Sequence, residues 1–129
     1  MSQLQQAPLL ALVVPCYDEA QGLMITMERL SSLLDECKRE GLASEKSCVW
    51  YIDDGSKDET WEIIEAACAK DVFCRGIKLS GNVGHQNALL AGLLELPADV
   101  DCAISLDADL QDDISAIKNM LSLFAEGYD

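Results

Sequence analysis

Basic residues are scarce in this chain of 129 residues. Nine lysines and arginines stand against 23 aspartates and glutamates, which leaves a formal net charge of -14 at pH 7. Such a surface repels a phosphate backbone, so nucleic acid is excluded as a partner. If the chain binds a small anion instead, a cation has to mediate between that anion and the acidic protein.

Long apolar runs and paired metal ligands are also missing. No apolar run approaches the roughly 20 residues that a membrane-spanning helix needs, and residues 1–8 lack the basic region of a signal peptide. The six cysteines include no C-x-x-C pair, and the single histidine, His85, has no companion at ligand spacing. These absences favour buried, reduced thiols over disulfides or zinc, and they predict a cytoplasmic protein.

Aromatic residues make up only 5% of the chain although half of it is hydrophobic, so we expect an aliphatic core. Apolar runs typical of strands cover 9–14, 48–52, 73–79 and 102–106. Amphipathic patterns typical of helices cover 21–39, a segment after Asp58, 85–94 and 114–124. The alternation predicts one α/β domain: a Rossmann-like open, mainly parallel sheet of about four β-α units with helices on both faces.

Polar clusters follow the predicted strands, at 17–19, 53–56, 81–85 and 107–113. Because the carboxyl ends of parallel strands share one edge of an open sheet, where ligands bind, we expect these clusters to converge on one crevice. The convergence of segments distant in sequence is stronger evidence for a site than any single motif.

Two carboxylates flank one small residue in Asp107-Ala108-Asp109. If the backbone stays extended beyond the strand, both carboxylates project to the same side. Mg²⁺ or Mn²⁺ prefers such oxygen ligands and keeps positions free for phosphate oxygens. The pair therefore predicts a metal site that would bridge an acidic pocket and a diphosphate. A bare D-x-D also arises by chance, and the alternative is an Asp-rich turn that caps the next helix.

The earlier clusters each allow a structural and a functional interpretation. Residues 53–56 form an Asx-type turn, or Asp54 accepts a hydrogen bond from a nucleobase while Gly55 allows close approach. Asp58 is assigned to helix capping. In 15–19 the acids either favour a helix N-terminus, or Tyr17 packs on a base or ribose and Glu19 accepts a hydrogen bond from one of them.

The cluster 81–85 offers backbone N–H groups and two glycines near a helix start, which is a weak indication of an anion site. It matches neither a Walker loop nor G-x-G-x-x-G. His85 either contacts a phosphate or serves as a capping or solvent-exposed residue.

In this order and spacing, the clusters resemble the motifs of family 2 inverting glycosyltransferases of the GT-A fold, and most closely those of polyprenyl- and dolichyl-phosphate sugar synthases. The family's V-V-P-x-Y-N-E corresponds to 13–19, with Asp18 in place of asparagine. Its V-D-D-G-S-x-D corresponds to 52–58, and its D-A-D-L-Q-D-P-P to the segment from 107 onward, without the prolines. Its N-x-G-K corresponds to 82–85, with His85 in place of lysine.

The resemblance implies a role for each matching position. Nucleotide-sugar contacts would come from a set of six residues: Pro15, Tyr17, Glu19, Asp54, His85 and Asp107. The divalent metal, Mg²⁺ or Mn²⁺, would be held by Asp107, Asp109 and Gln111. The reaction implied is the inverting transfer of a hexose from a UDP- or GDP-sugar to a polyprenyl phosphate, at the cytoplasmic face of the membrane in the full-length protein.

Such enzymes carry an acceptor-side general base and phosphate-gripping basic residues downstream of the D-x-D. Residues 1–129 are therefore interpreted as the nucleotide-sugar-binding part, truncated before the acceptor half, with no convincing catalytic base. Two alternatives are a binding-only nucleotide-sugar module and a receiver-type signalling domain, although the paired acids follow the second predicted strand instead of the first. The sequence leaves open whether copies associate as a homo-oligomer.

Overall fold

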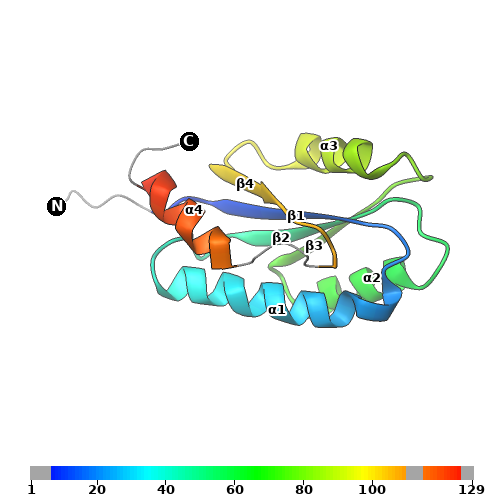
Figure 1. The fold of residues 1–129 in the computed structure, drawn as a ribbon, viewed down its shortest axis with the longest axis horizontal. Helices are drawn as coiled ribbons and strands as arrows, with labels where there is room; N and C mark the ends of the chain where they lie inside the picture. The colour runs from blue at the N-terminus through cyan, green and yellow to red at the C-terminus, as the bar shows by residue number, and fades with distance from the viewer. Residues whose placement is uncertain (1–6, 110–114, 126–129) are drawn as a thin grey trace.

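The computed structural model describes residues 7–109 and 115–125. Strands and helices alternate along the described chain: β1 (Leu10–Cys16), α1 (Ala20–Arg39), β2 (Cys48–Asp53), α2 (Thr60–Lys70), β3 (Cys74–Lys78), α3 (His85–Glu95), β4 (Cys102–Ser105) and α4 (Ser115–Ala125). The strands form one sheet in the order β3-β2-β1-β4, and every pairing is parallel. The predicted Rossmann-like α/β fold is confirmed (Figure 1).

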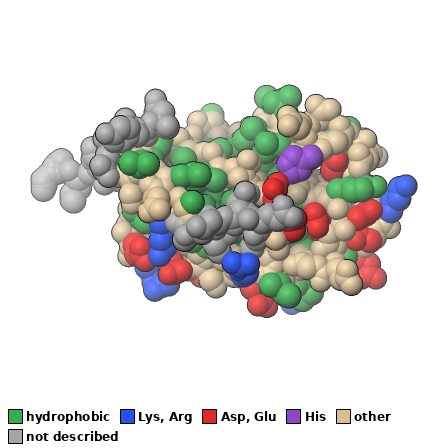
Figure 2. All heavy atoms as spheres, viewed as in Figure 1, with side chains coloured by type: hydrophobic (Ala, Val, Ile, Leu, Met, Phe, Trp, Pro, Cys, Tyr) green, Lys and Arg blue, Asp and Glu red, His purple; other side chains and the backbone are tan. Residues whose placement is uncertain are grey.

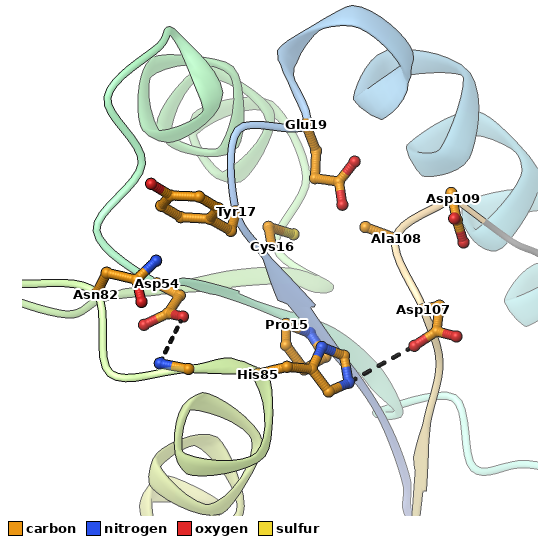
Figure 3. A pocket seen from close by; sticks show the side chains of 11 residues that line it. Pro15, Cys16, Tyr17, Glu19, Asp54, Asn82, His85, Asp107, Ala108 and Asp109 are labelled. Atoms are coloured by element: carbon orange, nitrogen blue, oxygen red, sulfur yellow. Dashed lines mark hydrogen bonds and ion pairs between the residues drawn. The ribbon is translucent and has the colours of Figure 1, made fainter.

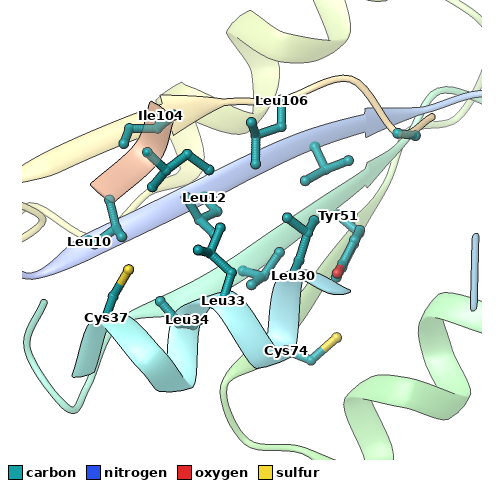
Figure 4. Packing of buried hydrophobic residues seen from close by; sticks show 14 of the residues in the cluster. Leu10, Leu12, Leu30, Leu33, Leu34, Cys37, Tyr51, Cys74, Ile104 and Leu106 are labelled. Carbon is teal, nitrogen blue, oxygen red and sulfur yellow. The ribbon is translucent and has the colours of Figure 1, made fainter. Parts of the chain in front are cut away.

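Helices cover both faces of the sheet, as predicted. Alternate residues of β1 point to opposite sides. Leu10, Leu12 and Val14 join a core with α1, α2 and α4 (Figure 4), whereas Ala11 and Val13 join a smaller core with α3. The connections through α1 and α2 step across the sheet in one direction, and the connection through α3 returns past β1 to the other edge. Right-handed crossovers then place α3 on the opposite face from α1 and α2.

Strand β1 continues through Pro15, although the sequence predicted that the strand would stop before it. In the ladder the carbonyl of Val13 accepts a hydrogen bond from Leu106 N on the β4 side, whereas the carbonyl of Cys16 accepts from Asp54 N on the β2 side. Residues of one strand alternate between neighbours, so Pro15 also faces the β4 side. The β1–β4 register ends at Val13, and the N–H that proline lacks is therefore not needed.

The loops after β1 and β2 are tied together by side chains. Asp58 accepts hydrogen bonds from Thr60 N at the start of α2 and from Ala20 N at the start of α1, at 2.9 and 3.2 Å. Asp58 thus binds the first N–H group of two helices, as a capping side chain does, although the N-cap positions themselves are Glu59 for α2 and Glu19 for α1. Burial acts to raise the pKa of Asp58, but the Thr60 hydroxyl and these N–H groups outweigh it and lower the pKa.

Helix α3 contacts the sheet through small residues. Ala88 and Gly92 are buried, whereas Leu90 and Leu93 are 53% and 40% exposed. A side chain at Gly92 would meet Ile52 at 2.7 Å, so glycine lets the helix lie close to the sheet. Neither α3 nor any other helix within residues 7–109 and 115–125 is long and apolar enough to cross a membrane.

Gly55 lets the loop after β2 pack against the loop after β3. Its φ is +70°, and a Cβ atom there would lie 2.5 Å from the backbone carbon of Gly81. The sequence interpretation, in which Gly55 makes room for a ligand, is therefore wrong: the structure fills that space with the chain's own backbone. The close approach instead helps to place the loop that precedes α3.

We expect Gly55→Ala to lower the free energy of unfolding by roughly 3 kcal/mol or more, because left-handed strain adds to a backbone clash. Gly41→Ala is the matched control, since Gly41 has a φ of +74° and a methyl group added there would have nothing within 4 Å. That variant should cost only about 1–2 kcal/mol. Urea unfolding of both variants measures the difference, and equal losses would contradict the packing described here.

Candidate functional site: an acidic cleft at the carboxyl edge of the sheet

A cleft of about 310 Å³ opens where β1 and β4 separate. This volume lies at the lower end of the range of about 300–1,000 Å³ that is typical of ligand pockets. The cleft is lined from the loops after all four strands, by Pro15, Cys16, Tyr17, Glu19, Asp54, Asn82, Gly84, His85, Asp107, Ala108 and Asp109 (Figure 3). None of these lining residues is a lysine or arginine, and Figure 2 shows acidic side chains close to His85 on this face.

The structure places seven of the predicted site residues along this one cleft: Pro15, Tyr17, Glu19, Asp54, His85, Asp107 and Asp109. What each of them binds stays a prediction. Gln111, the third predicted metal ligand, lies outside the described residues. Four further lining residues were not among the predicted site residues, although all of them lie inside the motifs and their position was the available signal: Cys16, Asn82, Gly84 and Ala108.

Asp107 and Asp109 flank a residue that is anchored in the core. Ala108 is 5% exposed and packs with the larger hydrophobic cluster, whereas the carboxylates on either side remain accessible. The chain turns at Ala108 instead of staying extended, yet both carboxylates still line the cleft. Within residues 7–109 and 115–125, no three acidic, cysteine or histidine side chains form a metal site by themselves.

Glu19 faces these two carboxylates from the start of α1 (Figure 3). Its pKa is raised, first by partial burial and then by the negative charges of Asp109, Asp58, Asp107 and Asp18. The carboxylates of Asp107 and Asp109 thus place negative charge beside Glu19 in the cleft. A bound cation would relieve the repulsion, and the donor set of carboxylate oxygens suits Mg²⁺ or Mn²⁺, which commonly bind through one or two carboxylates plus substrate phosphates.

Asp54 holds the loop that leads into α3. Its Oδ1 accepts a hydrogen bond from Val83 N at 2.7 Å, and its Oδ2 accepts one from Gly84 N at 3.1 Å. The N–H groups that suggested an anion site in 81–85 thus already bind an anion, which is Asp54. The side chain is only 3% exposed but borders the cleft, and each carboxylate oxygen keeps a further lone pair for a ligand.

His85 begins α3 and points toward Asp107 (Figure 3). Its Nε2 lies 3.6 Å from Asp107 Oδ1, and both side chains are about half exposed. The histidine is the one described lining residue that can carry a positive charge. It therefore lies where it can contact both a phosphate group and a carboxylate of the D-x-D.

Tyr17 and Cys16 form the wall opposite the D-x-D. Tyr17 is 40% exposed, which leaves its ring free to pack on a planar group. Cys16 is buried, and burial together with the charges of Glu19 and Asp53 raises the pKa of its thiol well above the usual range. The thiol donates to Val14 O, so Cys16 lines the cleft as a neutral side chain and not as a nucleophile.

An all-parallel α/β sheet with an acidic cleft at its carboxyl edge defines a Rossmann-like ligand-binding domain. The chain belongs to glycosyl transferase family 2, whose family model matches residues 11–129. Membership of this family rules out the receiver-type alternative.

Proteins similar in sequence to this chain are described as glycosyltransferases or sugar transferases. The chain is 44% identical over 123 residues to the uncharacterized glycosyltransferase YkoT of Bacillus subtilis, a match that covers 95% of this chain and 36% of YkoT. It is 38% identical over 130 residues to an undecaprenyl-phosphate 4-deoxy-4-formamido-L-arabinose transferase of Shewanella sediminis, covering 100% of this chain and 37% of that protein. The chain thus spans little more than a third of the length of these relatives.

Solved structures share the fold. A mannosyltransferase from Pyrobaculum calidifontis, PcManGT, in complex with GDP-Man and Mn²⁺, superposes with a TM-score of 0.72 at 18% identity, over 92% of this chain and 33% of that one. TarS of S. aureus in complex with UDP-GlcNAc superposes with a TM-score of 0.60 at 19% identity, over 91% of this chain and 31% of that one. The GT-A type of Rossmann-like fold expected from the sequence is confirmed.

We expect Glu19→Gln to stabilise the fold at pH 7, by less than about 1 kcal/mol because the group is partly solvated. A carboxyl whose pKa is raised by folding lowers stability as the pH rises from 4.5, its ordinary pKa, through the raised value. The gain should therefore shrink as the pH is lowered toward 4.5. Urea unfolding at pH 7 and pH 5 measures it, with Glu65→Gln on the exposed face of α2 as control. A gain that does not depend on pH would contradict the charge repulsion.

Proposed function

We propose that this chain provides the nucleotide-sugar site of a glycosyltransferase that transfers a hexose from a UDP- or GDP-sugar to a polyprenyl phosphate with inversion. The observation that carries the proposal is the acidic cleft, in which the D-x-D, Glu19, Asp54 and Tyr17 meet at the carboxyl edge of the sheet. A cleft without lysine or arginine among its described lining residues needs a cation to hold a diphosphate.

The nucleoside lies, in this proposal, between Tyr17 and the loop held by Asp54. The partly exposed Tyr17 ring packs on the base or ribose, and the free lone pairs of Asp54 accept from a base N–H. Pro15 forms the floor because β1 and β4 no longer pair beside it. Glu19 accepts a hydrogen bond from the ribose or the base, on the side of the cleft opposite Asp54.

The diphosphate lies against the D-x-D and His85. Asp107 and Asp109 would hold Mg²⁺ or Mn²⁺, with Gln111 as a third ligand by sequence. The cation, when bound, neutralises negative charge that develops on the leaving diphosphate. His85, at 3.6 Å from Asp107, holds that carboxylate toward α3 and offers its ring N–H to a phosphate oxygen. PcManGT, a protein of the same fold, is in complex with GDP-Man and Mn²⁺, which supports a divalent metal as part of the proposed donor site.

A polyprenyl phosphate is the acceptor that the sequence relatives favour. Several are described as undecaprenyl-phosphate 4-deoxy-4-formamido-L-arabinose transferases, and the chain matches about 37% of their length. A phosphate oxygen of such an acceptor is already a nucleophile, so the transfer does not need a strong general base. The described residues of this chain would therefore bind and orient the donor, at the cytoplasmic face of the membrane.

We expect the chain to bind UDP or GDP much more tightly with Mn²⁺ than without it. Asp107→Asn and Asp109→Asn should each weaken the metal-dependent part by 10-fold or more, because each removes a charged metal ligand, an effect on the order of that seen for metal-site residues. Isothermal titration calorimetry with UDP, GDP and their hexose conjugates, with and without Mn²⁺, measures this and identifies the base.

Asp99→Asn is the matched control, since Asp99 is exposed and does not line the cleft. It removes the same charge from the protein and should leave nucleotide affinity unchanged. Nucleotide binding that is insensitive to Mn²⁺, or equal losses in Asp99→Asn and Asp109→Asn, would overturn the proposed donor site. Donor binding without sugar transfer to a polyprenyl phosphate by the full-length protein would instead favour the binding-only module.

A further inference from the structure

We propose that Thr26 of α1 is a positioning residue for the D-x-D, and that its hydroxyl group fixes the backbone from which Asp107 and Asp109 present their carboxylates. The inference rests on the proposed function, because it assigns a purpose to the orientation of these two side chains. Thr26 lies outside all the motifs that indicated the family, and the sequence predicted no role in the site for any residue within α1.

The proposal is based on one hydrogen bond between α1 and the D-x-D. Thr26 Oγ1 donates to the carbonyl oxygen of Ala108 at 2.7 Å, across 82 residues of sequence. Thr26 is 5% exposed and Ala108 is also 5% exposed, so this bond is shielded from water. The acceptor belongs to Ala108, the middle residue of the D-x-D. A rotation of the backbone at Ala108 would therefore turn both flanking carboxylates.

This anchor acts where the sheet no longer supports the chain. The β1–β4 register ends at Val13 and Ser105, and the carbonyl of Val13 accepts its bond from Leu106 N. Beyond that point Ala108 has left the ladder and turns away from β1. The Thr26 hydroxyl and the burial of the Ala108 methyl group in the core therefore hold the turn from the α1 side.

Threonine suits this position for a physical reason. A threonine hydroxyl in a helix can bond back to the carbonyl one turn earlier, which serves no tertiary purpose. Here it bonds to Ala108 instead, and its β-branched side chain limits χ1 to few rotamers, of which the observed one aims the oxygen at the turn. An apolar residue of the same shape would remove the one side-chain donor that the described part of the chain supplies to this buried carbonyl, which is costly and would allow the turn to shift.

Metal binding is sensitive to such a shift. Ligand oxygens must lie within about 0.2 Å of their required distances, and groups that orient the ligands typically change metal affinity by about 10–100-fold when they are removed. Thr26 would act through Asp107 and Asp109 without touching the metal or the nucleotide. Loss of the Thr26 hydroxyl group should therefore lower Mn²⁺ affinity even in a variant that remains folded.

The test compares variants that differ in the hydroxyl group alone. Thr26→Val removes the oxygen and keeps the shape, and Thr26→Ala against Thr26→Ser repeats the comparison with smaller side chains in case valine prevents folding. Mn²⁺ affinity is measured from the electron paramagnetic resonance signal of free Mn²⁺, with and without UDP or GDP, and the free energy of unfolding is measured in urea. We expect Thr26→Val and Thr26→Ala to lose about 10-fold in Mn²⁺ affinity, and Thr26→Ser to retain it.

Ser47→Ala is the structural control. Ser47 is fully buried, and its Oγ accepts a hydrogen bond from Leu10 N at 2.9 Å, at the amino end of β1, away from the cleft. This variant should destabilise the fold as the Thr26 variants do but should keep Mn²⁺ affinity. Unchanged affinity in both Thr26→Val and Thr26→Ala, or an equal loss in Ser47→Ala, would overturn the inference while leaving the donor site standing. Absence of Mn²⁺-dependent nucleotide binding in the unchanged chain would overturn both.

Discussion

The separation of β1 from β4 beyond Val13 and Ser105 is the constraint on which the site depends. Strand β1 lies where the order of the sheet reverses, because two crossovers step away from it and the third returns to its other side. Neighbouring strand ends diverge at such a point and leave a crevice. Pro15, which has no N–H to donate, falls on the side where pairing has ended. The end of the ladder therefore opens the cleft, and the loops of the remaining strands complete it.

The acidic residues of this edge divide into two groups. Asp58 and Asp54 use their carboxylates to bind backbone N–H groups, and they hold two helix starts and the loop before α3. Asp107, Asp109 and Glu19 keep accessible carboxylates around the cleft, and their mutual repulsion contributes to the raised pKa of Glu19. The negative charge of this edge thus falls in two places, because Asp54 and Asp58 hold the loops and helix starts, whereas Asp107, Asp109 and Glu19 surround the cleft in which we propose a cation site.

Sequence reasoning predicted the elements closely where the hydrophobic period was clear. The helix expected over 21–39 begins at Ala20 and ends at Arg39, and the last strand ends one residue earlier than expected. It failed at β1, which continues through Pro15, and at Gly55, whose missing side chain makes room for Gly81 and not for a ligand. Both errors have one cause. The spatial neighbour that decides each outcome, β4 for Pro15 and the loop after β3 for Gly55, is not encoded in the local sequence.

What the sequence by itself determined is the fold class, the family and the set of residues at the strand ends, because periodicity and motif spacing are local properties of the chain. Only the tertiary structure decided how these residues are held. Asp54 reaches a loop 29 residues away and Thr26 reaches Ala108 across 82, and nothing in the local sequence announces either partner. Such bonds form between segments that the sheet topology brings together, so they become visible only once the strands have been placed in order.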